Sequence, residues 1–146
     1  MILSYKQKFP WGAPTNFDQK IIYGPKRHSI RDDIHNRWKP GMIIHHAYGV
    51  RTPDYRCFAK GQCFHIHKIE IKIIDNVDSI FSYCYMASKE TNIPTLFSVY
   101  IDDRPLTYKQ IEWLAENDGF SSTADFFRWF KEPGVKKIIH FTDFKY

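Results

Sequence analysis

Apolar and polar residues alternate along several short stretches of the chain, the pattern of half-buried strands. The longest stretch, residues 63–74, places Cys63, His65 and His67 on one face and the residues between them on the other. Six further stretches are apolar or alternating enough to predict strands. The seven expected strands cover residues 2–6, 27–31, 42–50, 63–74, 77–86, 96–101 and 136–144.

A helical spacing of apolar residues replaces this alternation after the first expected strand. Phe17 and Ile21 lie one turn apart, and Thr15 or Asn16 is a suitable N-cap for a short helix. Gly24 is expected to end this helix in a left-handed conformation, because glycine adopts that conformation at little cost.

Two more helices are predicted near the carboxyl end. Thr107 and Gln110 have the spacing of a capping box, and an apolar helical face follows them. The turn at residues 117–119 ends this helix. Ser122 then begins the next helix, with Asp125 three positions later.

The order of these elements favours an α+β fold over a doubly wound parallel sheet. Helices do not alternate regularly with the strands, so a mixed, barrel-like sheet with peripheral helices fits better. Residues 51–61 are polar and are expected to form a long loop. No linker or repeat divides the chain, so residues 1–146 are expected to form one domain.

Composition narrows the class of protein. Aromatic residues make up 17% of the chain, which favours a β-rich core. No apolar run is long enough to span a bilayer or to serve as a signal-peptide core. Three cysteines form no disulfide framework, so we expect free thiols and a cytoplasmic protein without a membrane partner. The net charge of +5 permits an anionic partner such as RNA, DNA or a nucleotide, without requiring one.

The basic segment at residues 24–32, GPKRHSIRD, concentrates the candidate chemistry. Lys26, Arg27 and Arg31 offer cations for phosphate, and arginine grips phosphate through two parallel hydrogen bonds. His28 is a candidate ligand contact. Neighbouring cations and partial burial lower the pKa of a lysine, and neutral Lys26 is then a base for the Ser29 hydroxyl. Strict strand alternation separates these two residues, so they converge only if Lys26 lies in the preceding turn.

Aromatic residues with basic neighbours suggest further contacts with a nucleobase. Lys6, Lys8 and Trp11 precede the first helix, and Trp38 lies between two basic residues. Such a group stacks a base beside a phosphate contact. A place in the core or in a lid is the alternative for both tryptophans.

Histidines raise the question of a metal site. His65, His67 and Cys63 share a predicted strand face, and a His-His pair at residues 45–46 lies on another strand. Their spacing matches no compact zinc module. We therefore expect no metal and no cofactor.

Three segments together resemble the ASCH domain family of the PUA-like superfamily. Residues 17–31 resemble that family's short helix followed by Gly-x-Lys-x-x-Thr-x-Arg. Residues 39–41, Lys-Pro-Gly, resemble its Lys-x-Gly element before a strand, and residues 117–120 resemble its acidic-Gly-Phe turn between two helices. The resemblance implies a PUA-like β-barrel with a cleft at the basic segment, and binding of RNA or nucleotides.

A subset of ASCH proteins are amidohydrolases that deacylate N4-acetylcytidine. Their site holds a lysine, a threonine three residues later and an acid from the later helical region. The matching positions here are Lys26, Ser29 and either Asp118 or Glu116. The chain departs from the pattern in carrying Ser29 for threonine, and Asp118 where the hydrolases carry glutamate.

These sequence features support three hypotheses about the function. The leading hypothesis is a nucleic-acid- or nucleotide-binding domain, RNA-related, with its basic cleft around residues 24–32. The competing hypothesis is an amidohydrolase of acylated nucleobases that uses Lys26, Ser29 and an acid. An interaction domain without a small ligand is the third reading. The expected partner is RNA, a nucleoside or a nucleotide, and the oligomeric state stays open.

Overall fold

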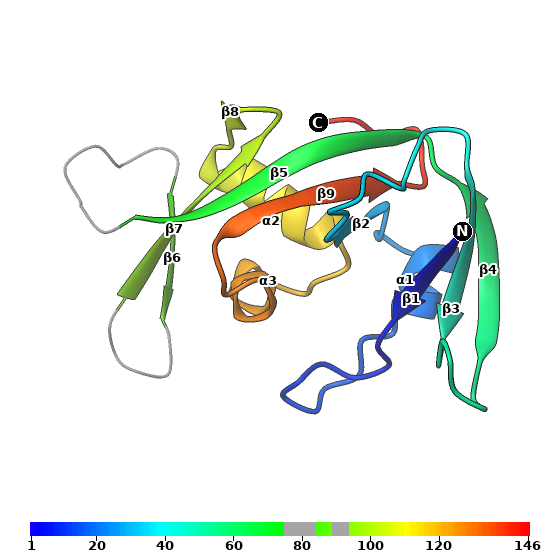
Figure 1. Ribbon diagram of the computed structural model, residues 1–146. Coiled ribbons are helices and arrows are strands. Elements are labelled where there is room, and N and C mark those ends of the chain that lie inside the picture. The colour runs from blue at the N-terminus through cyan, green and yellow to red at the C-terminus, as the bar shows by residue number, and fades with distance from the viewer. Residues whose placement is uncertain (75–83, 89–93) are drawn as a thin grey trace.

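The computed structural model describes residues 1–74, 84–88 and 94–146 (Figure 1). Its helices are α1 (Phe17–Ile22), α2 (Tyr108–Asn117) and α3 (Thr123–Trp129). Its strands are β1 (Ile2–Tyr5), β2 (His28–Arg31), β3 (Ile43–Tyr48), β4 (Arg56–Gln62), β5 (His65–Ile74), β6 (Cys84–Ser88), β7 (Pro94–Ile101), β8 (Arg104–Pro105) and β9 (Gly134–His140). The α+β class is thereby confirmed.

The strands form two sheets. The smaller has the order β1-β3-β4, with β1 parallel to β3 and β4 antiparallel to it. The larger is antiparallel, with the order β2-β9-β5-β7-β6 and with β8 paired to β7. Figure 1 shows α1 beside the smaller sheet, and α2 and α3 beside the larger one. No closed barrel is found among the residues that the structure describes.

The alternation along residues 63–74 correctly predicts the faces of β5. Ile69 and Ile71 continue the face of His65 and His67, and both isoleucines are almost completely buried. Helix α3 packs against this sheet through Phe127, whose ring stacks on that of Phe97 of β7 at 4.5 Å between centroids. The larger sheet and the two later helices therefore enclose the main core.

The predicted signals at the helix ends are partly confirmed. Thr107 and Gln110 form the expected capping box at α2, and Ser122 caps α3 by accepting a hydrogen bond from the Asp125 N–H. Gly24 directly follows Tyr23, the C-cap of α1, so it lies at the predicted end of the helix, but its predicted left-handed conformation is wrong because its φ is not positive. Glycine is favoured there because a Cβ would lie 3.1 Å from the Cα of Lys20.

The predicted loop at residues 51–61 is confirmed for residues 51–55 and wrong for residues 56–61. Most of it belongs to β4, which pairs with β3 along the smaller sheet. β4 is an edge strand with exposed polar positions such as Arg56 and Lys60, so its composition resembles a loop. Of the strand expected at residues 77–86, residues 77–83 lie outside the described residues.

Two further findings bear on the class of protein. Cys57 and Cys63 are free thiols. In the described ranges, no helix combines the length and apolar character needed to cross a membrane.

Candidate functional site

A buried ion pair joins the basic segment to the turn after α2. Lys26 Nζ donates a hydrogen bond to Asp118 Oδ1 at 2.9 Å and a second to the backbone carbonyl of Asp118. The two residues are 92 positions apart in the sequence, and each is only 3% exposed. The fold therefore brings one predicted cation and one predicted acid into direct contact.

Backbone contacts place these two side chains. The Arg27 N–H donates to the Asn117 carbonyl at 2.7 Å, which ties the start of β2 to the end of α2. Gly119 has a φ of 87°, a left-handed conformation that favours glycine. A Cβ at Gly119 would lie 3.0 Å from Cδ of Lys26. The predicted Asp118-Gly119 turn thus lets the lysine side chain pass close to the backbone.

Asp118 also has partners on β2. Its Oδ1 accepts a hydrogen bond from the Ile30 N–H at 3.3 Å and lies 3.4 Å from His28 Nδ1. Burial would raise the pKa of Asp118. The positive charge of Lys26 and hydrogen bonding to His28 outweigh burial and hold that pKa below its ordinary value. The carboxylate is therefore ionised at neutral pH.

Lys26 has an unusually low pKa for a lysine. Burial lowers it from 10.5 to about 8, because the attraction of Asp118 offsets only part of the desolvation. Aromatic rings surround the ammonium, with the Phe17 centroid at 4.6 Å and the Tyr5 centroid at 5.9 Å. A lysine of this kind exchanges its proton near neutral pH, which is a property of catalytic bases and of structural pairs alike.

Three more polar residues gather around Tyr5. The Tyr5 hydroxyl is hydrogen-bonded to His46 Nδ1 at 2.8 Å. Burial raises the pKa of Tyr5, and the charge of Arg31 and a hydrogen bond with Ser29 oppose it. Burial, together with the charges of Lys26 and Arg31, lowers the pKa of His46 to about 4. His46 is therefore neutral at pH 7.

Arg31 connects the two sheets at this point. Its Nη2 donates to the carbonyl of Ser4 on β1 at 2.7 Å, and its guanidinium carbon lies 5.1 Å from the Tyr5 ring centroid. Arg31 is half-buried, whereas the other members of the group are buried. We name the group the Lys26 cluster; it comprises Tyr5, Lys26, Ser29, Arg31, His46 and Asp118.

The predicted pair of Lys26 and Ser29 is brought together only indirectly. Ser29 is 3% exposed and interacts with Tyr5, whose ring also lies near the Lys26 ammonium. No hydrogen bond joins Lys26 to Ser29 in the part of the chain that is described. Lys26 lies in the turn before β2, the position that the sequence required for the two to converge.

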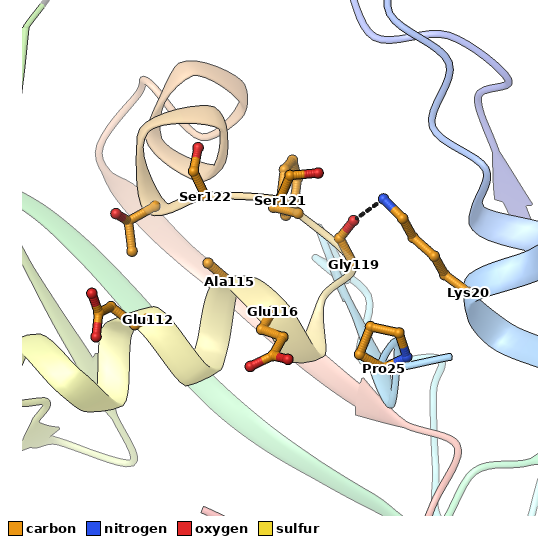
Figure 2. Close-up of a pocket in the computed structure, with 10 residues that line it drawn as sticks. Lys20, Pro25, Glu112, Ala115, Glu116, Gly119, Ser121 and Ser122 are labelled. Atoms are coloured by element: carbon orange, nitrogen blue, oxygen red, sulfur yellow. Dashed lines mark hydrogen bonds between the residues drawn. The ribbon is translucent and has the colours of Figure 1, made fainter. Parts of the chain in front are cut away.

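The alternative acid, Glu116, lies away from Lys26, at a surface pocket. This pocket has a volume of about 520 Å³, and its lining includes Lys20, Pro25, Glu112 and Glu116 (Figure 2). Lys20 reaches across to the Gly119 carbonyl at 2.7 Å. Glu116 is exposed, so of the two candidate acids the structure brings Asp118, not Glu116, to Lys26.

The predicted ligand-binding residues are spread over several places. His28 is fully buried and hydrogen-bonded through Nε2 to the Tyr146 hydroxyl at 2.6 Å. Arg27 is exposed, with its guanidinium 5.2 Å from the Phe144 ring centroid. Trp38 lies in the core at 8% exposed, so it presents no open face to a base.

Lys6, Lys8 and Trp11 lie in the segment between β1 and α1. Both lysines are exposed, and the Lys6 ammonium lies 5.7 Å from the ring centroid of Trp129. Trp11 is half-buried and stacks on Phe9. None of these three residues belongs to the Lys26 cluster.

The histidines make no recognisable metal centre. His28 and His65 both pair with His140 in the strand register, so three imidazoles line up across β2, β9 and β5. His67 Nδ1 contacts Asp102 Oδ2 at 2.5 Å. Among the described residues, no group of three or more His, Cys, Asp or Glu side chains could hold a metal ion.

Two members of the Lys26 cluster, Tyr5 and His46, were not expected there. The only available signal was alternation, which puts His46 on the same strand face as buried Ile44. Tyr5 reaches the cluster through pairing of β1 with β3, a contact that periodicity does not specify.

Comparison with known proteins finds no matching family model, no matching curated protein and no matching solved structure. The geometry of the Lys26 cluster therefore carries the functional argument.

Proposed function

We propose that this protein is a nucleic-acid- or nucleotide-binding domain of the ASCH type, with a PUA-like arrangement of its strands and a ligand site at the Lys26 cluster. The supporting observation is the contact between Lys26 and Asp118. These residues belong to two of the three sequence segments that resemble the ASCH family. Such a meeting is expected if the resemblance reflects a common site.

The Lys26 cluster has the chemistry to bind an anionic nucleotide. Arg31 is its most exposed cation, so it is the group that an approaching phosphate meets first. Its guanidinium offers paired donors for phosphate oxygens. Tyr5 provides an aromatic ring directly beneath that guanidinium. The net charge of +5 favours the approach of a polyanion.

A binding assay with nucleotides tests this proposal. Titration with cytidine and uridine monophosphates, followed by calorimetry, is expected to give an affinity that falls as salt rises. Arg31→Ala is expected to weaken binding about tenfold or more, since charge-assisted hydrogen bonds contribute about 1.5–3 kcal/mol. Arg37→Ala removes an exposed arginine of the same charge elsewhere and is the control. Equal affinities of these two variants would contradict the assignment of the site.

A second function, amide hydrolysis of an acylated nucleobase, is favoured by the pKa of Lys26. With a pKa of about 8, roughly a tenth of the Lys26 side chains are neutral at pH 7. This mechanism requires substrate binding to bring Lys26 within hydrogen-bond reach of Ser29. Ser29 Oγ then attacks the acyl carbon, and neutral Lys26 accepts the hydroxyl proton. The C–N bond then breaks, with the proton passing from Lys26 to the leaving amine. Water cleaves the resulting Ser29 ester, releasing the acid and restoring the hydroxyl.

Incubation with N4-acetylcytidine tests this second function. Deacetylation is expected to accelerate from pH 6 to pH 8, as Lys26 loses its proton. Ser29→Ala is expected to abolish turnover, while Ser121→Ala, at an exposed serine, leaves it unchanged. Turnover that persists in Ser29→Ala would remove the serine from the mechanism.

A further inference from the structure

An aromatic platform lies beside the Lys26 cluster, built from the β1–α1 segment and from α3. Phe9 is its centre and stacks face to face on Trp11, with centroids 4.7 Å apart and planes 1° from parallel. The Trp129 ring meets Phe9 edge-on at 5.6 Å. We name Lys6, Phe9, Trp11, Arg128 and Trp129 the aromatic platform (the β1–α1 segment and α3 are seen in Figure 1).

Cations lie over both tryptophans of the platform. The Arg128 guanidinium carbon is 4.5 Å from the Trp11 ring centroid, and the Lys6 ammonium is 5.7 Å from that of Trp129. Both cations belong to exposed residues, and both tryptophans are half-buried. Packing of these aromatic rings against one another does not require the Lys6 and Arg128 cations, so their presence needs another explanation. Phe9 covers one face of Trp11 and Arg128 lies over the ring, so a base stacks on Trp11 when the exposed Arg128 side chain moves from the ring to a phosphate. Half-exposed rings with such cations beside them supply both stacking faces and phosphate contacts.

Two buried phenylalanines, Phe9 and Phe17, lie between the exposed part of the platform and the Lys26 cluster. The Phe9 and Phe17 rings are 5.8 Å apart, and the Phe17 ring centroid is 4.6 Å from the Lys26 ammonium. Phe9, Phe17 and Lys26 are all buried, so these contacts run through the core and show that the two groups are close in space. At this separation the nucleotides that flank one at the cluster reach the platform. A free nucleoside is too small to contact both.

We propose that the aromatic platform binds the nucleotides that flank the one at the Lys26 cluster, so that the ligand is a single-stranded nucleic acid. This rests on the proposed nucleotide-binding function for the identity of the partner. Single strands fit because their bases are unpaired and present open faces for stacking, whereas a duplex conceals them.

The chain provides a matched control for the platform. Trp113 is 49% exposed and has the Lys109 ammonium 5.6 Å from its ring centroid, but it lies on α2 and belongs to neither site. Trp113→Ala therefore removes an equivalent cation–aromatic pair without touching the platform. Trp11→Ala and Arg128→Gln are the test variants.

The experiment measures fluorescence anisotropy of a labelled 12-nucleotide oligouridine, alongside calorimetry with uridine monophosphate. Trp11→Ala is expected to weaken oligouridine binding about fivefold or more, because stacking contributes about 1–3 kcal/mol per base. Arg128→Gln is expected to weaken oligouridine binding as well and to lessen its dependence on salt. Trp113→Ala is expected to leave oligouridine binding unchanged, and the monophosphate affinity is expected to be the same in all three variants.

The outcomes separate the two proposals. Oligouridine binding that is equal in Trp11→Ala, Arg128→Gln and Trp113→Ala overturns the platform, and so does a failure of oligouridine to bind at low salt. Oligouridine binding that depends on Trp11 and Arg128, without any binding of the monophosphate, supports the platform and overturns the ligand site at the Lys26 cluster. If Trp11→Ala does not fold, Arg128→Gln and Lys6→Gln, both at exposed positions, decide the question by the same comparison.

Discussion

Replacing Asp118 by asparagine removes the negative charge beside Lys26 but keeps the shape of the side chain. The pKa of Lys26 is about 8 in the folded protein against 10.5 in solution, and each pKa unit corresponds to about 1.4 kcal/mol. The buried ammonium therefore already costs about 3 kcal/mol of stability. Without Asp118, the buried Lys26 side chain loses its proton instead. Deprotonating a lysine with a pKa of 10.5 costs about 5 kcal/mol at pH 7. The difference, about 1–2 kcal/mol, is the expected destabilisation.

The sign of the pH dependence follows from which state binds the proton. Because the pKa of Lys26 is lowered by folding, the unfolded chain binds the extra proton between about pH 8 and pH 10.5. Wild-type stability from this group therefore rises with pH in that window. In Asp118→Asn the folded pKa is lower still, so the rise begins at a lower pH. The destabilisation is expected to shrink towards zero by pH 9.

Urea unfolding, followed by tryptophan fluorescence from pH 6.5 to pH 9, measures this effect. Asp143→Asn makes the same chemical change at an exposed carboxylate and is the control. A destabilisation by Asp118→Asn that stays constant over this range would refute the reasoning. A loss well above 5 kcal/mol would also refute it, since Lys26 would then remain charged without its partner.

Three further predictions concern stability. Burial lowers the pKa of His140 to about 3, so the unfolded state binds the extra proton and stability falls as pH drops below about 6.5. In urea unfolding, His140→Leu is expected to reduce this dependence of stability on pH, while His35→Leu, at an exposed position, leaves it unchanged. Gly119→Ala is expected to lower the melting temperature more than Gly12→Ala, because both glycines have φ near 90° but only the Cβ at Gly119 meets other atoms; equal losses would show that backbone strain alone is responsible. Thr107→Ala is expected to cost about 1 kcal/mol by thermal unfolding, since the threonine hydroxyl caps α2, and no loss would mean that the helix end is held by packing instead.

Local sequence signals anticipated the elements well where the signal was itself local. The capping residues Thr107 and Ser122 satisfy N–H groups only three positions away, so short spacing was enough to predict them. The alternation in β5 worked because one face of that strand is buried in the core. β4 was missed because an edge strand with exposed side chains lacks that alternation. The ASCH-like arrangement stays a prediction, since no comparison tests it.

In the candidate site, too, local sequence signals predict some features and the tertiary structure decides the others. The types and order of residues in the basic segment and in the Asp118-Gly119 turn are properties of the chain, and they were enough to propose a lysine paired with an acid. Choosing Asp118 over Glu116 required the tertiary structure, because the two side chains leave the end of α2 in different directions and only one meets Lys26. The lowered pKa of Lys26 likewise comes from burial beneath Phe17 and beside Tyr5. Desolvation depends on what surrounds a group in space, and residues distant in the chain provide those surroundings.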